Sequence, residues 1–376
     1  MIVVLHAYSR GNRGDGLLVD LTIELIRCSV PSEDIIKVVA VDAKSFCDLD
    51  NVISAPNIRD NKITQLLTAI FSIIKIILHI SGIKNLYLNN ISKELECANL
   101  IVGVGGGYLR SGRSIEGLKS LVVHATQLLL TEHSKSKTIY LPQSIGPLRG
   151  MFGSLLRRSI KSLDIICLRD NRSINEIGWH KGVRRFPDLA VMKIAKMKII
   201  TEKNYERIYL IARDISGSSK KKKLYRKKIK YLKKSFPDLI VVLQSEVRGN
   251  SDTFFYKELG WGEDFKTLKC AIDEYGRGIV ISVRLHGSLE SIMLGCPSIH
   301  LSYERKGYGA YEDLNLKEYV HNVNDFDVQR VSDQVLGLKI NAEKYWEKVS
   351  EAVVCIERYH ENLTKLVSEN YRKSVE

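Results

Sequence analysis

The stretch IVISVRLHGSLESIMLGCPSIHLSY, residues 279–303, decides the fold that we expect for this chain. An apolar run, Ile279–Val283, leads through an Arg-Leu-His sequence into a helix that opens with small residues. The turn at 295–297 then brings the chain into a second apolar run, Ser298–Ser302. A strand, a helix and a further strand in so few residues make a βαβ unit. The pattern therefore predicts an α/β protein built on parallel sheets.

Arg284 and His286 stand where the first of these strands ends. Open α/β sheets bind their ligands at that edge. A guanidinium can hold a carboxylate or phosphate through two parallel hydrogen bonds, and an imidazole can donate another bond or move a proton near neutral pH. The plainer interpretation is a buried arginine with a core histidine. The helix that starts at Gly287-Ser288 directs its amino end to the same place, which favours an anion site.

The same alternation of apolar runs and helical patterns extends along the chain. In the first half, strands are expected at 2–5, 35–41, 100–104, 138–141 and 165–168. In the second half, they are expected at 207–212, 239–243, 279–283 and 298–302. The polar segment 191–206 is the expected linker between a domain of residues 1–193 and one of residues 205–340. A terminal helix over 342–372 is expected to pack back across the hinge.

The loop after the first strand, residues 9–16, carries three glycines together with Asn12 and Asp15. Glycines such as Gly11 let a backbone approach a ligand closely, and the two polar side chains can hydrogen-bond sugar hydroxyls or cap the helix that follows. A plain strand-to-helix turn with Asp15 as its cap is the alternative.

Two later strands also end in loops that suit ligand binding. The strand at 100–104 runs into the glycines Gly105, Gly106 and Gly107. This cluster lacks the lysine and hydroxyl of a P-loop, and it fails the dinucleotide fingerprint because position 110 is arginine. A Rossmann dehydrogenase and an ordinary ATPase are thus disfavoured. The strand at 138–141 ends at Gln143 and Ser144, which we expect to face the cleft.

Taken in order, these motifs resemble the polysaccharide pyruvyl transferase family over residues 2 to about 320. The Ser-x-Arg-x-His block at 282–286 and the Tyr303/Lys306 strand end look like the family's carboxyl-terminal motifs, and Arg213 looks like the arginine that opens its second domain. The loop at 11–15 and Pro187-Asp188 resemble its amino-terminal motifs. The resemblance implies an α/β fold of two Rossmann-like domains that face each other across a cleft, as in GT-B glycosyltransferases.

The resemblance also implies the chemistry. A pyruvyl group would move from phosphoenolpyruvate to a saccharide and form a pyruvate ketal, in the biosynthesis of a surface polysaccharide or glycan. His286 would be the general acid and Asp15 the base, while Arg213 and Arg284 would bind the donor in the second domain. No metal and no cofactor beyond this donor substrate are expected. The other residues that the resemblance assigns to substrate binding are Gly11, Asn12, Gly106, Gly107, Gln143, Ser144, Gln244, Leu285, Tyr303 and Lys306.

Composition agrees with a large protein of a reducing compartment. The chain has 376 residues, of which 44% are hydrophobic, enough for two buried cores. Its seven cysteines are scattered without a Cys-x-x-Cys pair, so a disulfide framework and structural zinc are both disfavoured. Met1 leads directly into a strand without a signal-peptide pattern. We therefore expect a cytoplasmic protein.

The charge of +14 indicates an acidic partner or surface. Much of it lies in the lysine-rich helix expected at 220–234, whose plainer interpretation is a solvated helix face. Nucleic acid is disfavoured because no binding motif or stacking platform accompanies the charge. An anionic membrane, at its inner face, fits better. The segment Ile63–Ile80 has one polar stripe and predicts either a core helix or an interfacial helix, in which case a lipid-linked saccharide would be the acceptor.

Two other functions stay open at the level of sequence. A GT-B glycosyltransferase that uses a nucleotide sugar would share the architecture and a basic diphosphate site. A noncatalytic protein that binds polysaccharide or membrane would share the fold alone. The motifs at 284–286 and 303–306 favour the pyruvyl transferase over both.

Overall fold

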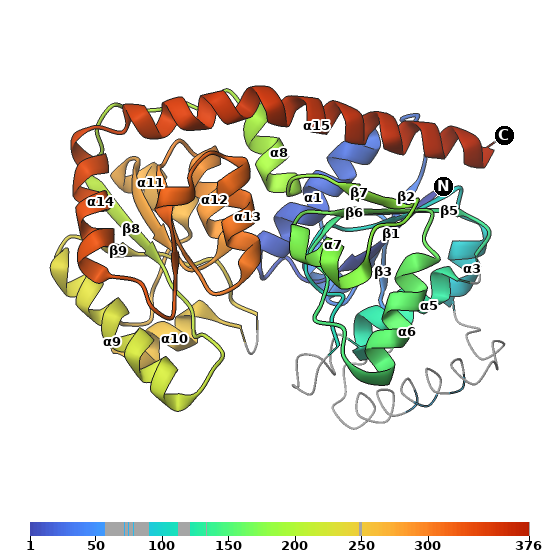
Figure 1. The fold of residues 1–376 in the computed structure, drawn as a ribbon, viewed down its shortest axis with the longest axis horizontal. Helices are drawn as coiled ribbons and strands as arrows, with labels where there is room; N and C mark the ends of the chain where they lie inside the picture. The colour runs from blue at the N-terminus through green and yellow to red at the C-terminus, as the bar shows by residue number, and fades with distance from the viewer. Residues whose placement is uncertain are drawn as a thin grey trace. The chain divides into compact units, whose positions relative to one another are not determined.

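The computed structural model describes residues 1–56, 90–111, 121–132, 134–247 and 250–375, together with positions 71, 74 and 78. Most of the segment Ile63–Ile80 lies outside the described residues. The chain forms two compact units (Figure 1). The first comprises Met1–Arg10, Asp15–Leu189 and His360–Glu376, and the second comprises Gly11–Gly14 and Ala190–Tyr359.

The first unit is built on a parallel sheet of seven strands in the order β3-β2-β1-β4-β5-β6-β7. The order reverses between β1 and β4, which is the Rossmann arrangement and places a topological switch point between these two strands. The strands are β1 Ile2–Ala7, β2 Ile36–Ala40, β3 Val52–Ser54, β4 Leu100–Gly103, β5 Lys137–Gln143, β6 Ile165–Leu168 and β7 Val183–Arg185.

The second unit has a parallel sheet of five strands in the order β12-β11-β10-β8-β9. Counted from β8, this is the order 2-1-3-4-5 of flavodoxin-like sheets, whose switch point lies between β8 and β10. The strands are β8 Arg207–Ile211, β9 Ile240–Val241, β10 Gly278–Ser282, β11 Ser298–Ser302 and β12 Val320–Asn322.

Helices connect the strands of both sheets (Figure 1). In the first unit these are α1 Arg13–Arg27, α3 Asn90–Glu96, α5 Thr126–Thr131, α6 Gly150–Lys161 and α7 Asn171–Ile177, with the short turns η1 Ala43–Phe46 and η2 Leu121–Ala125. The second has α8 Leu189–Lys196, α9 Ser219–Ser235, α10 Asp252–Leu259, α11 Leu268–Tyr275, α12 Leu285–Met293, α13 Arg305–Asp313, η3 Lys317–Tyr319 and α14 Val328–Ile340. The last helix, α15 Glu343–Val375, has residues counted in each unit.

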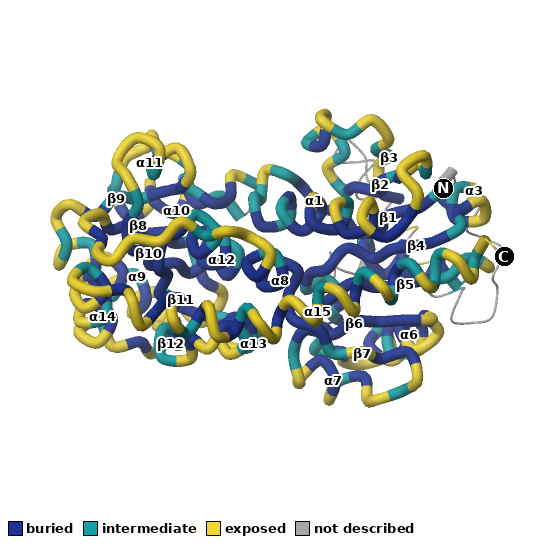
Figure 2. The backbone as a smooth tube through the Cα atoms, turned by 90° about the horizontal axis from the view of Figure 1, so that it is seen from above, coloured by how far each residue is buried: buried dark blue, intermediate teal, exposed yellow. Residues whose placement is uncertain are grey.

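The central strands are buried along their whole length, as Figure 2 shows for β1 and β4. Parallel strands covered by helices on both faces need continuous apolar runs rather than alternation, and β1, β4 and β10 have such sequences. The predicted α/β class with doubly wound parallel sheets is therefore confirmed.

Two details differ from the sequence prediction. The short strands β3, β7 and β12 were not predicted, since each has three residues and no long apolar run. The segment expected as a polar linker from 191 onward begins inside helix α8, where Val191, Met192 and Ile194 are buried. Apolar side chains on one face of this helix pack into the core, so its lysines alone gave a misleading signal.

Candidate functional site

The second unit brings most of the predicted site residues to one edge of its sheet. Ile211 of β8 pairs in register with Ser282 of β10, so Arg213 and Arg284 lie equally far beyond the ends of neighbouring strands. Tyr303 follows the next strand, β11, which pairs with β10 on its other side. These three strand ends flank the switch point between β8 and β10, where a doubly wound sheet binds its ligand.

Arg284 is buried and its guanidinium is held by an internal carboxylate. Its Nε and Nη2 donate to Oδ1 of Asp252 at 2.9 and 2.5 Å, and Nη2 also donates to the carbonyl of Asn250 at 2.8 Å. The other carboxylate oxygen of Asp252 accepts the backbone N–H groups of Gln244 and Ser245. A buried charge needs an opposite charge, and Asp252 supplies it. The two-bond grip that the sequence predicted for a substrate is thus taken up within the protein.

Arg213 has a different environment. Its Nη1 donates to the hydroxyl of Tyr303 at 3.0 Å, and the guanidinium lies 5.1 Å from the centre of that ring. Its Nε donates to the backbone carbonyl of Asp214 at 3.1 Å. In the part of the chain that the structure describes, Arg213 forms no salt bridge with a carboxylate. A partly buried cation without such a partner favours an anionic ligand.

Arg284 is the N-cap of α12, and His286 is the second residue of that helix, after Leu285. The N-cap residue Arg284 makes no side-chain cap bond, and the positive end of the helix dipole at this terminus favours a negative charge nearby. Gly14 packs against the imidazole: a Cβ at this position would come within 2.7 Å of Nδ1 and 2.8 Å of Cβ of His286. The glycine of the amino-terminal loop therefore permits the contact that fixes His286. Leu285 is itself buried and contributes only its backbone to this helix start.

The loop 11–14 is joined to the end of β9 by backbone contacts. Glu246 donates its N–H to the carbonyl of Gly11 at 3.0 Å, Arg13 donates its N–H to the carbonyl of Gln244 at 3.1 Å, and Asn12 forms an antiparallel bridge with Ser245. The predicted site residues Gly11, Asn12 and Gln244 are therefore brought together.

Glu290 of α12 adds side-chain bonds to the same contact. Its Oε1 accepts from Nη2 of Arg13 at 2.5 Å, and its Oε2 accepts from Nε2 of Gln244 at 3.0 Å. Sequence reasoning missed the roles of Glu290 and Asp252 because each is defined by a partner far away in the chain. The sequence alone could have indicated only that each is an acidic residue in a loop or helix close to the end of a strand.

The end of β11 carries Tyr303 and Lys306. The Nζ of Lys306 lies 3.0 Å from Oε2 of Glu304, and Glu304 is the N-cap of α13 without a side-chain cap bond. Behind this turn, His300 is buried and bonds to the carbonyl of Ser282 and the hydroxyl of Ser288. Burial, with Lys306 adding to it, lowers the pKa of His300 to about 3, so it stays neutral.

The first unit gathers the remaining predicted residues at the ends of β4 and β5. Ser144 donates its N–H to the carbonyl of Gly106 at 2.7 Å, and its hydroxyl donates to Asp170 at 2.6 Å and accepts from Arg169 at 2.9 Å. Gly107 lies beside Arg169 as well. Gln143, however, is fully buried rather than facing a cleft, because its amide group donates to the carbonyl of Val104 and the hydroxyl of Tyr108.

A buried aromatic cluster lies next to these residues, and no motif in the sequence predicts it. His6 stacks on Tyr108 with ring centres 4.5 Å apart, and its Nε2 lies 2.8 Å from the hydroxyl of Tyr140. His124 also stacks on Tyr108, with ring centres 4.6 Å apart, and its Nδ1 lies 3.3 Å from Nδ1 of His6. Burial lowers the pKa of both histidines, that of His124 to about 3. The cluster is therefore held together without charge.

Asp15 belongs to the first unit and lies in the first turn of α1 rather than at its cap. Burial raises the pKa of Tyr8, and the negative charges of Asp15 and Asp42 raise it further. The assignment of Asp15 as a base stays a prediction.

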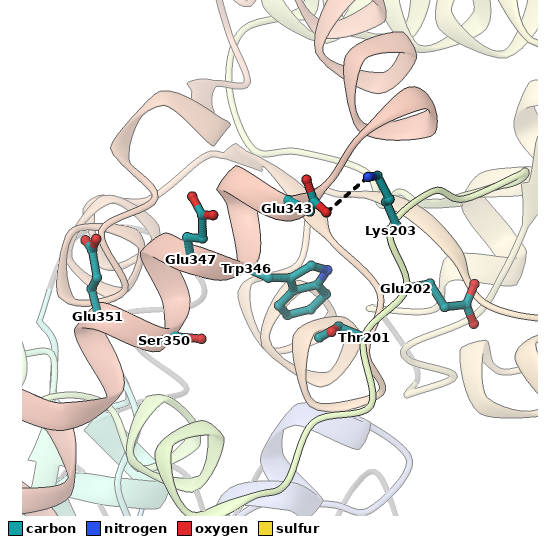
Figure 3. A pocket seen from close by; sticks show the side chains of 8 residues that line it. All are labelled: Thr201, Glu202, Lys203, Glu343, Trp346, Glu347, Ser350 and Glu351. Atoms are coloured by element: carbon teal, nitrogen blue, oxygen red, sulfur yellow. Dashed lines mark ion pairs between the residues drawn. The ribbon is translucent and has the colours of Figure 1, made fainter.

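A hollow of about 620 Å³ in the second unit shares no lining residue with the predicted site (Figure 3). Trp346 is among its lining residues, and four glutamates surround it, namely Glu202, Glu343, Glu347 and Glu351. Two of these glutamates form ion pairs: Glu343 with Lys203 and Glu202 with Arg277, each at 3.3 Å. Such an acidic lining would repel phosphoenolpyruvate. In the described ranges, no group of three His, Cys, Asp or Glu side chains is placed to hold a metal ion.

Comparison with known proteins assigns the family. A sequence model of the polysaccharide pyruvyl transferases matches residues 12–305, well over half of the chain. The chain belongs to the polysaccharide pyruvyl transferase family. The match covers the loop 12–14 and all three strand ends described above, and the family description supports a transferase. The resemblance drawn from the motifs is therefore confirmed.

The individual proteins that this chain resembles share few identical residues with it. The amylovoran biosynthesis protein AmsJ of Erwinia amylovora is 29% identical over 91 residues, which span 24% of this chain and 22% of AmsJ. Among solved structures, a putative UDP-N-acetylglucosamine 2-epimerase from Listeria monocytogenes has a TM-score of 0.52 at 12% identity, over 99% of this chain and 96% of that one. The glycotransferase of kitacinnamycin has a TM-score of 0.50 at 10% identity, over 99% and 98%. These likenesses support the GT-B-like fold and nothing finer.

Proposed function

We propose that this chain transfers a pyruvyl group from phosphoenolpyruvate to a saccharide and forms a pyruvate ketal in polysaccharide biosynthesis. The family assignment supports a transferase, and the partial match to AmsJ supports the biosynthetic context. The observation that carries the proposal is Arg213, a partly buried cation at the switch point with a tyrosine rather than a carboxylate as its side-chain partner.

Phosphoenolpyruvate suits this edge of the sheet because it carries a carboxylate and a phosphate. Arg213 binds one of them by charge-assisted hydrogen bonds. The amino-terminal end of α12, with its positive partial charge, favours the other. Arg284, paired with Asp252, holds the strand end in place. Lys306 lies at the neighbouring strand end, beside the uncapped start of α13.

The reaction needs a proton first. Phosphoenolpyruvate is an enol ester, and protonation of its methylene carbon makes C2 electrophilic. His286 supplies this proton as the general acid. A sugar hydroxyl then adds to C2 and loses its proton to a base, for which Asp15 is the candidate. Phosphate departs with the C–O bonding electrons, and a second hydroxyl of the same sugar attacks C2 and releases its proton, which closes the ketal. Arg213 offsets the charge of the departing phosphate.

We assign the acceptor to the first unit, where Gly106, Gly107 and Ser144 come together at the ends of β4 and β5. Glycines leave their backbone N–H and C=O groups accessible, and Ser144 adds a hydroxyl. Such groups can form hydrogen bonds with a saccharide. A lipid-linked saccharide is one form that this acceptor would take.

The test supplies the purified chain with phosphoenolpyruvate and a panel of neutral oligosaccharides, with nucleotide sugars offered in parallel. Mass spectrometry would detect a pyruvylated saccharide, and released phosphate would match it in amount. A His286→Asn variant should form product at least about 100-fold more slowly, as expected for loss of a general acid. Transfer of a sugar from a nucleotide donor, without any reaction of phosphoenolpyruvate, would instead establish the glycosyltransferase alternative. If neither reaction occurs, the noncatalytic alternative is the one that remains.

A further inference from the structure

Helix α9, Ser219–Ser235, carries a large share of the net charge of the chain (Figure 1). Its sequence contains nine lysines, one arginine and no acidic residue. One face is buried through Tyr225, Ile229 and Leu232, which fix the helix in the core of the second unit. Eight of these ten basic side chains fall into two groups according to which way they point from this buried face; Lys221 and Lys233 belong to neither.

The first group is neutralised within the protein. Lys222 pairs with Asp214 at 2.8 Å, and Arg226 pairs with Glu258 at 2.6 Å. Lys228 donates to the carbonyl of Phe326 at 2.7 Å. These residues flank the buried face, and carboxylates or a backbone carbonyl of the second unit partner their positive charges.

The second group forms an unbroken stripe. Its members are spaced three and four residues apart, which places them on the side of the helix opposite the buried face. All five are exposed, and none forms a salt bridge with another described residue. We name this row the lysine stripe; its residues are Lys220, Lys223, Lys227, Lys230 and Lys234. It runs for about 21 Å at 1.5 Å per residue.

The lysine stripe works against the helix that carries it. Like charges three and four residues apart repel each other, and lysines in the first turn oppose the helix dipole. The first turn of α9 contains no acidic residue that would offset this. A solvated helix face has no need of such a row, so its placement indicates an external anion.

Two exposed apolar side chains lie beside the stripe. Leu224 is 46% exposed and Tyr231 is 59% exposed; they are seven residues apart and form a row roughly 70° around the helix from the centre of the stripe. An aliphatic and an aromatic side chain among lysines are typical of helices that lie in a membrane interface, where lysines reach the head groups and the apolar groups enter the lipid. A polyanion in solution would require only the lysines.

We propose that α9 docks the protein on an anionic lipid surface through the lysine stripe, with Leu224 and Tyr231 inserted among the lipids. Each lysine near an anionic leaflet strengthens binding, and the effects add along the helix. The proposal rests on the surface of α9 alone, so it stands or fails independently of the chemistry proposed above. It concerns attachment to a surface: no helix in the described ranges is long and apolar enough to cross a bilayer.

The test measures sedimentation of the full chain with phosphatidylcholine vesicles that contain about one-third phosphatidylglycerol, and with pure phosphatidylcholine vesicles. We expect binding to the anionic vesicles only, weakened as salt rises from about 0.1 to about 1 M and the Debye length falls from about 10 to 3 Å. Replacing Lys223, Lys227, Lys230 and Lys234 by glutamine should weaken it by about 100-fold or more, since each lysine contributes about fivefold. The same four lysines replaced by arginine should bind as the native chain does.

A matched control removes the same charge elsewhere. Lys196, Lys198, Lys269 and Lys344 are also exposed, and their replacement by glutamine should leave binding within about threefold of the native chain. Lysine and glutamine have similar helix propensities, so the stripe variant should fold, which its far-ultraviolet circular dichroism would verify. Equal loss in both variants would mean that net charge alone is sensed, and that result would overturn the proposal.

The apolar pair separates a membrane from a soluble polyanion. A variant with Leu224→Asn and Tyr231→Asn keeps every lysine and should bind anionic vesicles about tenfold more weakly. It should bind dextran sulfate as the native chain does. Unchanged vesicle binding in this variant, or native binding to single-stranded RNA that is tighter than to vesicles, would contradict the lipid surface.

Discussion

Arg213 and Arg284 show at the scale of single residues how one sequence signal divides into two roles. Both arginines follow the ends of neighbouring strands, and the sequence predicted that both would bind the donor. Arg284 is compensated by the buried Asp252, whereas Arg213 contacts Tyr303. The arginine with a carboxylate partner stabilises the strand end, and the arginine without one is the better ligand for an anion.

Removal of the Asp252 charge should therefore affect stability first. We expect Asp252→Asn to lower the free energy of unfolding by about 3 kcal/mol or more, because it leaves Arg284 buried without its counter-charge. Urea denaturation followed by circular dichroism measures this. Glu258→Gln, which breaks the partly exposed pair with Arg226, should cost less than about 1 kcal/mol. Equal costs for the two variants would mean that Arg284 finds another partner.

Gly14 allows a second prediction at this scale. A methyl group at position 14 would press on the imidazole of His286, so Gly14→Ala should displace this residue, the proposed general acid. A displacement of about 1 Å can cost on the order of 100-fold in rate, and we expect a loss of that size in kcat. Gly16→Ala on the same helix is the control, because its Cβ would meet Arg10 at an ordinary 3.4 Å. The account of Gly14 fails if both variants keep native activity.

Buried histidines give the protein a pH-dependent stability. The pKa of His300 falls from 6.5 in the unfolded chain to about 3 in the fold, chiefly through burial. The fold thus favours the neutral form, and this contribution is complete above pH 6.5 and is lost as the pH falls toward 3. At about pH 5 the loss should be roughly 2 kcal/mol for such a histidine. Urea denaturation at about pH 7 and about pH 5 should show a smaller difference for His300→Gln than for the native chain; an identical difference would exclude His300 as the cause.

The sequence located the strand-end residues correctly but could not assign their partners. Spacing within a strand, loop and helix places Arg284 and His286 at a sheet edge because those rules are local. The pairing of Arg284 with Asp252, or of Glu290 with Arg13, depends on how separate segments meet. For the same reason the prediction for Gln143 was wrong. This residue stands at a strand end, where ligand-binding residues often lie, but it is buried and donates to the carbonyl of Val104.

At the scale of elements, the long apolar strands could be predicted and the short ones could not. β6 and β11 have the bounds that the sequence predicted. β12 contains three residues of mixed character and becomes a strand only because it adds to the open edge of β11. Helix α8 was hidden by its lysines, which lie beside an apolar face that the core requires.

Two glycines in helices of the second unit should respond to alanine in opposite ways. Gly307 of α13 lies so close to His300 and Ser302 of β11 that a Cβ would clash with both side chains, and we expect Gly307→Ala to cost about 1–3 kcal/mol. Gly337 of α14 faces open space, so Gly337→Ala should add up to about 1 kcal/mol from helix propensity. Thermal melting followed by circular dichroism compares them. A stabilised Gly307→Ala variant would show that α13 can move away from the sheet.

At the scale of the whole molecule, each unit brings residues that the sequence singled out to neighbouring strand ends of its own sheet. The first unit brings Gly106, Gly107 and Ser144 to the ends of β4 and β5, and the second brings Arg213, Arg284 and His286 to the ends of β8 and β10. The order of strands was not predictable, because periodicity shows that strands alternate with helices but not which strand lies beside which. The family match explains why these motifs occur together in one chain.

The central claim is that Arg213 receives the anionic donor, and calorimetric titration with phosphoenolpyruvate tests it most directly. Arg226 is the matched control: it too lies over an aromatic ring, 5.5 Å from the centre of Phe255, but it is compensated by Asp214 and Glu258. We predict that Arg213→Met weakens binding by about 10- to 100-fold, the range expected for a charged hydrogen bond, while Arg226→Met stays within about twofold of the native chain. Native affinity in Arg213→Met, or equal weakening in both variants, would contradict the claim.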